Sequence, residues 1–213
     1  MFLVSVIGTT LALQSPVSPT RLPAKPPKQS TAVYGLLAAN FGIFMADKVT
    51  PLHSLYLNHA AFRAYQPLTA CFCHSTRSHL SGNLFLLLLF GRSVEDDWGP
   101  NGLLVAYAFC GILANLASLA ILPRATISLG ASGSVYGLFA VSVLSVRSLE
   151  WRKVTELLVL GDFVVSRVLS EMKTAAMGGI PGVNHVAHIA GAAAGAFLVL
   201  LLRIIDRSSR NID

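Results

Sequence analysis

The stretch GASGSVYG, residues 130–137, opens an apolar run from Leu129 to Val146. Gly133 and Gly137 lie four residues apart, so on a helix they share one face. This G-x-x-x-G spacing is common where membrane helices touch, because two glycine faces let the helix backbones approach closely. The stretch therefore predicts a helix with a glycine face that packs against a neighbouring helix.

Similar apolar runs make up most of the chain. Of its 213 residues, 54% are hydrophobic and only 12% are charged, with a mean hydropathy of +0.63. A soluble domain carries about 25% charged residues, so the composition indicates an all-α, polytopic membrane protein. A membrane-spanning helix needs about 20 mostly apolar residues. Six such helices are predicted: Ala32–Ala46, Leu80–Val94, Gly102–Leu122, Leu129–Val146, Val154–Leu169 and His185–Ile205.

The net charge of +6 comes from 16 basic and 10 acidic residues. An excess of basic residues can indicate nucleic-acid binding. Here the basic residues are scattered through short gaps between apolar runs, which is typical of membrane-flanking anchors. The pattern favours a lipid bilayer as the partner and no nucleic acid.

Residues 1–31 differ from the rest of the chain. They contain three basic residues and no acidic one, and they are rich in proline and hydroxyl side chains. This composition is typical of an organelle transit peptide, with a disordered tail or a secretory signal over Phe2–Leu13 as alternatives. We expect a leader over residues 1–31, a membrane domain over 32–206 and a polar tail over 207–213.

Ser132 and His188 are the first candidates for chemistry. A serine among small residues at the start of a helix is exposed, and its backbone N–H lacks an intrahelical partner. His188 is predicted in the first turn of the last span, on a face shared with Gly191 and Gly195. If that face packs on the glycines after Ser132, the imidazole reaches the hydroxyl and can act as its base. Packing roles for either residue remain the alternative.

A second polar group contains His74, His79 and Asn83. Positions 79 and 83 are one helical turn apart, so their side chains share a face and can both donate to a developing oxyanion. A zinc site that adds His185 and His188 is the alternative. The chain has no H-E-x-x-H motif, and the spans that contain Asn83, His185 and His188 have no carboxylate that could act as a further ligand. No metal or other cofactor is therefore predicted.

The three spans that carry these motifs, Leu80–Val94, Leu129–Val146 and His185–Ile205, contain no carboxylate that could complete a Ser–His–Asp triad. The sequence therefore predicts a dyad in which packing orients the imidazole. Tyr136, one turn after Ser132, could stack on the His188 ring, or it could serve ordinary core packing.

Together these motifs resemble the rhomboid family of intramembrane serine proteases. H-x4-H-x3-N in the second span, G-x-S-G at the fourth and A-H-x-x-G in the sixth occur in the family's order. The resemblance implies a six-transmembrane-helix bundle and a serine endopeptidase that cleaves membrane-protein substrates. The alternative is a non-proteolytic relative that binds client helices.

The resemblance also implies a role for each motif residue. Ser132 would be the nucleophile and His188 the base, while His79, Asn83 and the Ser132 N–H would form the oxyanion hole. Supporting positions would be His74, Tyr136, Gly130, Gly133 and Gly191.

Two further features accompany the resemblance. Glu95 matches an acid that braces the first loop, whereas residues 65–69 stand where the family often carries Trp-Arg. The motifs around Leu122–Thr126, Trp151–Val154 and Val183–His188 are similar to those of plant plastid rhomboids. They favour the chloroplast inner envelope, with the mitochondrial inner membrane as second choice.

Overall fold

The computed structural model describes residues 31–145, 166 and 184–210, and these are mostly helical. The α-helices of the described residues are α1 (Ala32–Val49), α2 (Gln66–Thr69), α3 (Arg77–Ile121), α4 (Ser132–Leu144) and α6 (His185–Arg210). Two 3-10 helices, η1 (His53–Leu55) and η2 (Ala70–Phe72), and two short strands, β1 (Leu57–Asn58) and β2 (Ile127–Ser128), complete the elements.

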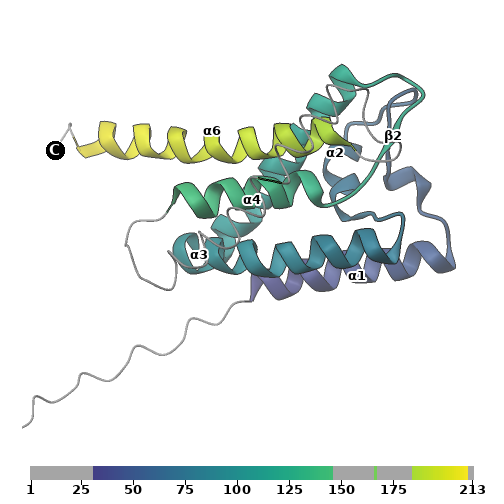
Figure 1. Ribbon diagram of the computed structural model, residues 1–213, viewed down its shortest axis with the longest axis horizontal. Helices are drawn as coiled ribbons and strands as arrows, with labels where there is room; N and C mark the ends of the chain where they lie inside the picture. Colours follow the sequence, from purple (N-terminus) through teal and green to yellow (C-terminus); the bar gives the residue numbers. More distant parts are fainter. Residues whose placement is uncertain (1–30, 146–165, 167–183, 211–213) are drawn as a thin grey trace, which may run out of the picture.

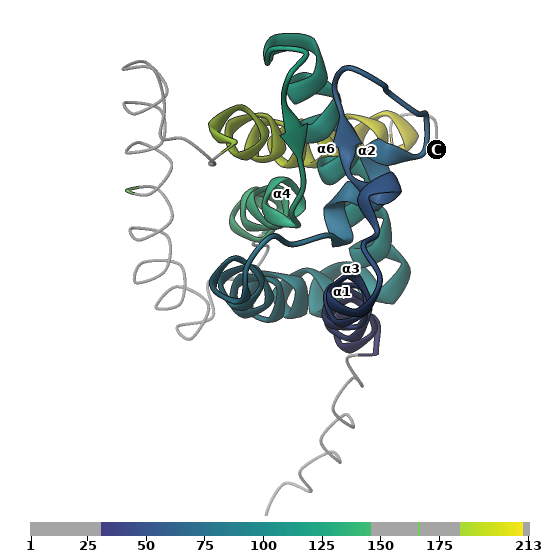
Figure 2. The same ribbon diagram turned by 90° about the vertical axis from the view of Figure 1, so that its right-hand side faces the viewer.

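The long helices lie side by side, with α4 between α3 and α6 (Figures 1 and 2). The short elements between α1 and α3, together with β2, gather at one end of this bundle. Both α4 and α6 begin at that end and run away from it, whereas α1 runs toward it. The first turns of α4 and α6 are therefore close to the loops and close to each other.

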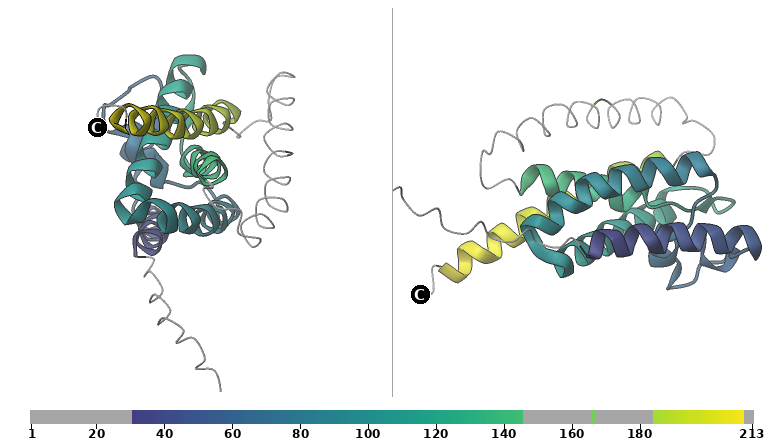
Figure 3. Two further views of the ribbon diagram at one scale, coloured as in Figure 1. Left: turned by 90° about the vertical axis from the view of Figure 1, so that its left-hand side faces the viewer. Right: turned by 90° about the horizontal axis from the view of Figure 1, so that it is seen from below.

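Helix α3 contains two of the predicted spans and is interrupted between them. Gly99 has φ 78° and ψ 174°, a conformation outside the helical region that glycine adopts without a steric penalty. Pro100 follows, and proline is well suited to the first turn of a helix because its missing N–H is not needed there. The chain thus turns at Gly99, and the part after it runs in another direction (Figure 3).

In the described part of the chain, three helices, α1, α3 and α6, are long and apolar enough to cross a membrane. The 13-residue α4 is shorter than the predicted run from Leu129, because the chain at Gly130 is not helical. Helix α6 continues to Arg210, into the expected polar tail. The predicted fifth span, Val154–Leu169, lies outside the described residues except for Ser166.

The strands β1 and β2 form a small antiparallel pair that an all-α prediction did not include. Leu57 pairs with Ser128 and Asn58 pairs with Ile127. This pairing attaches the loop after α1 to the segment that leads into α4. The pairing therefore holds Ser128, which lies four residues before Ser132, in a fixed position.

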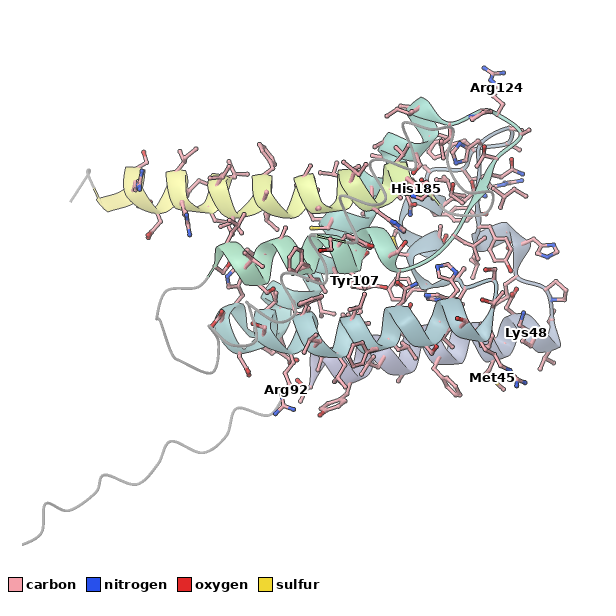
Figure 4. All side chains as sticks on the ribbon, in the orientation of Figure 1. Met45, Lys48, Arg92, Tyr107, Arg124 and His185 are labelled. Carbon is pink, nitrogen blue, oxygen red and sulfur yellow. The ribbon has the colours of Figure 1, made fainter. Side chains whose placement is uncertain are left out.

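Tyr107 connects the helices to the same loop region. Its side chain is buried in the interior of the bundle (Figure 4), where its hydroxyl donates to the carbonyl of Cys71 at 2.8 Å. The side-chain amide of Asn40 on α1 lies 3.2 Å from that hydroxyl. One buried phenol thus ties α1, α3 and η2 together.

Charged residues mark the two ends of the bundle. Arg92 lies at the end where α1 begins, whereas Lys48 and Arg124 lie at the opposite end, with the loops (Figure 4). This separation is the one expected of an apolar bundle whose two ends face water.

Glu95 has a different role from the expected brace of the first loop. Its Oε1 accepts hydrogen bonds from the backbone N–H groups of Thr31 and Ala32, both at 2.9 Å, and its Oε2 accepts from Val33 at 3.0 Å. The Thr31 side chain makes no capping hydrogen bond, so the first turn of α1 needs an outside acceptor. The buried carboxylate therefore caps α1 from α3.

We predict that Glu95→Gln lowers the stability of the fold. One oxygen of the cap becomes an NH₂ group that faces backbone donors, which leaves a buried N–H unpaired at a cost of about 1–3 kcal/mol. Thermal unfolding in detergent measures the effect. Arg124→Gln, which removes an exposed charge among the loops (Figure 4), is the control and should leave the midpoint nearly unchanged. Equal midpoints for Glu95→Gln and the native protein would contradict the capping role.

Candidate active site

The site is built where α4 and α6 touch. A Cβ atom added to Gly191 would overlap the backbone of Gly133, and one added to Gly195 would overlap the backbone of Gly137. The two helix backbones are therefore in direct contact over two successive turns. The contact of the two glycine faces predicted from the sequence is confirmed.

Ser132 is the first residue of α4 and is half-buried. Its backbone N–H belongs to the first turn, where no intrahelical acceptor exists. The two preceding residues are held by the loop: Gly130 N donates to the carbonyl of Ala70 at 2.9 Å, and Ala131 N donates to His74 Nε2 at 3.4 Å. The serine is thus presented from a helix start whose entry is anchored.

His188 lies in the first turn of α6, three residues before Gly191, and its ring packs on that of Tyr136 from α4. The two rings are stacked, with centroids 4.6 Å apart and planes 8° from parallel. Because Gly133 approaches the Ala187 carbonyl, the residues next to Ser132 and His188 are neighbours in space. The helix contact and the ring stack together fix the plane of the imidazole beside the start of α4.

Gly130 provides the space in front of the serine. A Cβ atom at this position would lie 2.8 Å from His79 Nε2 and 3.7 Å from Ser132 Oγ. The φ angle of Gly130 is 132°, a value that residues other than glycine rarely adopt. The absence of a side chain thus lets the His79 ring and the serine hydroxyl face the same small space.

Asn83 follows His79 by one turn of α3. Its side chain is 6% exposed, and its Nδ2 has no hydrogen-bond partner among the described residues. Buried amide donors are nearly always paired in folded proteins, so an unpaired one needs an explanation. A donor kept free for a ligand or a transient anion is such an explanation.

His74 is buried behind the loop that leads to Ser132. Burial and, to a lesser extent, the nearby His79 lower the pKa of His74 to about 4, while a hydrogen bond with the Phe72 backbone acts in the opposite direction. The ring is therefore neutral at pH 7, and its Nε2 lone pair can accept from Ala131. The His74 and His79 rings meet edge to face with centroids 5.0 Å apart.

The described residues contain no group of three or more His, Cys, Asp or Glu side chains that could hold a metal ion. His185, which the zinc alternative included, has its ring centroid 6.4 Å from that of His188. The three cysteines, Cys71, Cys73 and Cys110, are free and buried.

Sequence reasoning missed a polar cluster at the start of α6. Asn184 directly precedes the helix, and its side chain contacts Ser118 and Ser128. An asparagine before an apolar run is a recognisable N-cap signal. Its contacts with two distant serines depend on the tertiary fold, and no local sequence pattern predicts them.

Comparison with known proteins adds independent information. The family model described as the Rhomboid domain matches residues 61–204. Rhomboid-like protein 11, chloroplastic, of Arabidopsis thaliana is 44% identical over 200 residues, which cover 89% of this chain and 71% of that protein.

More distant relatives match over shorter parts of their length. RHOMBOID-like protein 4 of Arabidopsis thaliana is 33% identical over 138 residues, covering 64% of this chain and 34% of the relative. Rhomboid-like protease 3 of Toxoplasma gondii is 33% identical over 95 residues, covering 45% of this chain and 35% of the relative. The matched region contains all the residues of the candidate site, and this chain belongs to the rhomboid family.

Proposed function

We propose that this protein is an intramembrane serine endopeptidase with Ser132 as nucleophile and His188 as general base. The observation that carries the proposal is the contact between the glycine faces of α4 and α6. It puts the start of a helix that bears a half-buried serine beside a histidine whose ring is held by a stacked tyrosine. Two relatives of the family carry the word protease in their names, which is in line with this activity.

The reaction follows from these positions. Ser132 Oγ attacks the carbonyl carbon of the scissile peptide while His188 takes the hydroxyl proton. The imidazolium then gives this proton to the leaving amine as the C–N bond breaks, which leaves an acyl-enzyme. Water, deprotonated by His188, attacks the acyl carbon, and the proton returns to Ser132 when the acid product leaves.

The oxyanion of each tetrahedral intermediate needs preorganised donors. His79 Nδ1 lies 3.3 Å from Ser75 Oγ, and if Ser75 donates there, Nε2 carries the proton toward the space above Gly130. Asn83 Nδ2 and the N–H of Ser132 are the other donors in this proposal. Donors fixed in a water-poor site stabilise developing charge without reorganising first.

Tyr136 replaces the carboxylate of a triad in this proposal. The stacked phenol ring restricts rotation of the imidazole, so the base is oriented by packing and not by a charge. His74 has an indirect role: its Nε2 accepts from the N–H of Ala131 and so helps to position the adjacent Ser132.

The substrates would be membrane proteins. A substrate helix would unwind near its end, and the extended strand would enter between the loops where α4 and α6 begin, with a small residue at the cleavage position.

We also propose six spans. Helix α4 ends and α6 begins at opposite ends of the bundle, so one more crossing between them gives the count that the sequence predicts.

We propose a plastid membrane, specifically the chloroplast inner envelope, as the location of this protein. The similarity to a protein named chloroplastic supports the plastid. The acid-poor composition of residues 1–31 supports their role as a transit peptide. A tagged chain with and without residues 1–31, imported into isolated chloroplasts, tests both statements.

We predict that Ser132→Ala abolishes cleavage of a transmembrane substrate and labelling by a fluorophosphonate probe. The alanine lacks the oxygen that forms the acyl or phosphonyl bond. Labelling and cleavage by the purified protein in detergent are the measurements. Ser134→Ala is the matched control, because this serine lies two residues further along α4 and is fully buried.

The alternative activity predicts a different result in the same experiment. A non-proteolytic member of the family that binds client helices would show no labelling of the native protein at any probe concentration. Cleavage that persists in a folded Ser132→Ala protein would contradict the assignment of the nucleophile.

We predict that Asn83→Ala separates activity from stability. The variant loses an oxyanion donor, so kcat should fall by about 10²–10³. The buried amide Nδ2 has no hydrogen-bond partner among the described residues, so loss of this donor breaks no hydrogen bond there, and the thermal midpoint should not fall through loss of one. Measured together, kcat and the midpoint test the role. A variant with native kcat would exclude Asn83 from the oxyanion hole.

A further inference from the structure

A polar cluster at the start of α6 lies outside the residues assigned to the reaction. Oδ1 of Asn184 accepts from the backbone N–H of Ala187 at 2.9 Å, which caps the first turn of the helix. Its Nδ2 donates to Ser118 Oγ at 2.9 Å and to Ser128 Oγ at 3.0 Å. One side chain thus joins α6, the last turn of α3 and strand β2.

The direction of each hydrogen bond follows from the donors present. The Ala187 N–H can only donate, so the oxygen of the Asn184 amide must face it and the NH₂ group must face the two serines. Ser118 gives its own proton to the carbonyl of Ala114 at 3.0 Å and accepts from Asn184. The amide therefore has both of its functional groups engaged.

Ser128 extends the cluster to the first loop. Its hydroxyl accepts from Asn184 and lies 3.0 Å from His59 Nε2, to which it can donate. Burial lowers the pKa of His59, which keeps the ring neutral and able to accept. The loop after α1 is thereby connected to the start of α6.

The position of the cluster along the chain is what relates it to the chemistry. Asn184 lies four residues before His188, and Ser128 lies four residues before Ser132. The hydrogen bond between them therefore joins the segments that lead into the proposed base and the proposed nucleophile. His185, the next residue after Asn184, lies at the end of α6 where the loops gather (Figure 4).

The glycine contact alone does not define how far α6 lies along α4. Two glycine faces have no side chains that interdigitate, so they resist sliding less than a surface with large side chains does. A shift of a small part of the 5.4 Å helical pitch would take the imidazole out of reach of the serine hydroxyl. A polar tie at the start of the helix removes this freedom.

We propose that Asn184 is a positioning residue whose amide, by tying α6 to Ser128 and Ser118, sets the position of His188 relative to Ser132. This inference rests on the proposed protease function. It differs from simple helix capping, because a cap needs only the bond to Ala187, whereas the tie needs the bonds to the two serines.

Asn184→Ser separates the two roles. Serine caps a helix about as well as asparagine, but its short side chain cannot also reach both hydroxyls. The rate of fluorophosphonate labelling is measured over a range of probe concentrations, together with thermal unfolding. We expect the maximal labelling rate of the folded protein to fall by about ten- to a hundredfold, with the half-saturating probe concentration close to native. The thermal midpoint should fall modestly, because the hydrogen bonds to the two serines are lost while the helix cap is kept.

Ser128→Ala removes the other partner and should slow labelling in the same way. Because both changes break one tie, the double variant should be little slower than either single variant. Ser142→Ala is the matched control. This serine lies in α4, where its hydroxyl donates to the Phe139 carbonyl of the same helix, and the variant should label at the native rate.

The outcomes distinguish this inference from the proposed function. Native-rate labelling of Asn184→Ser, or effects of the two single variants that multiply in the double variant, would overturn the positioning role alone. No labelling of the native protein would overturn the proposed protease function and the positioning role with it.

Discussion

The close contact of α4 with α6 is the constraint on which the rest of this structure depends. Gly133 and Gly137 meet Gly191 and Gly195 with no side chain between the backbones. In a membrane there is little hydrophobic gain from bringing helices together, so close packing of small residues is what holds such a pair. The candidate chemistry lies at one end of this contact, where both helices start.

The surrounding structure fixes that end and leaves a few groups unsatisfied. The β1–β2 pair and His74 hold the entry to α4, and Asn184 holds the entry to α6. Within this frame Asn83 keeps a buried donor that finds no partner in the part of the chain that the structure describes, and Gly130 adopts a backbone conformation that few residues tolerate. Such costs are typical of functional sites, where stability is given up for a preorganised arrangement.

The sequence was informative where the signal is local. Helix-face spacing predicted the glycine contact, and four of the predicted spans have counterparts in α1, α3 and α6. It was not informative where a role depends on what the fold brings near. Glu95 caps α1 and does not brace the first loop, because the fold brings its carboxylate next to the backbone N–H groups at the start of α1. The two-residue strands are too short to show alternation, and the contacts of Asn184 with two serines join residues more than fifty positions apart.

The most direct test of the account is Gly191→Ala, compared with Gly42→Ala on α1, where an added Cβ meets nothing within 4 Å. The measurement is the rate of fluorophosphonate labelling of Ser132 in protein that remains folded. The account predicts that Gly191→Ala separates the helices and slows labelling by about a hundredfold, while Gly42→Ala labels like the native protein. Equal labelling rates for the two variants would contradict the claim that this helix contact builds the site.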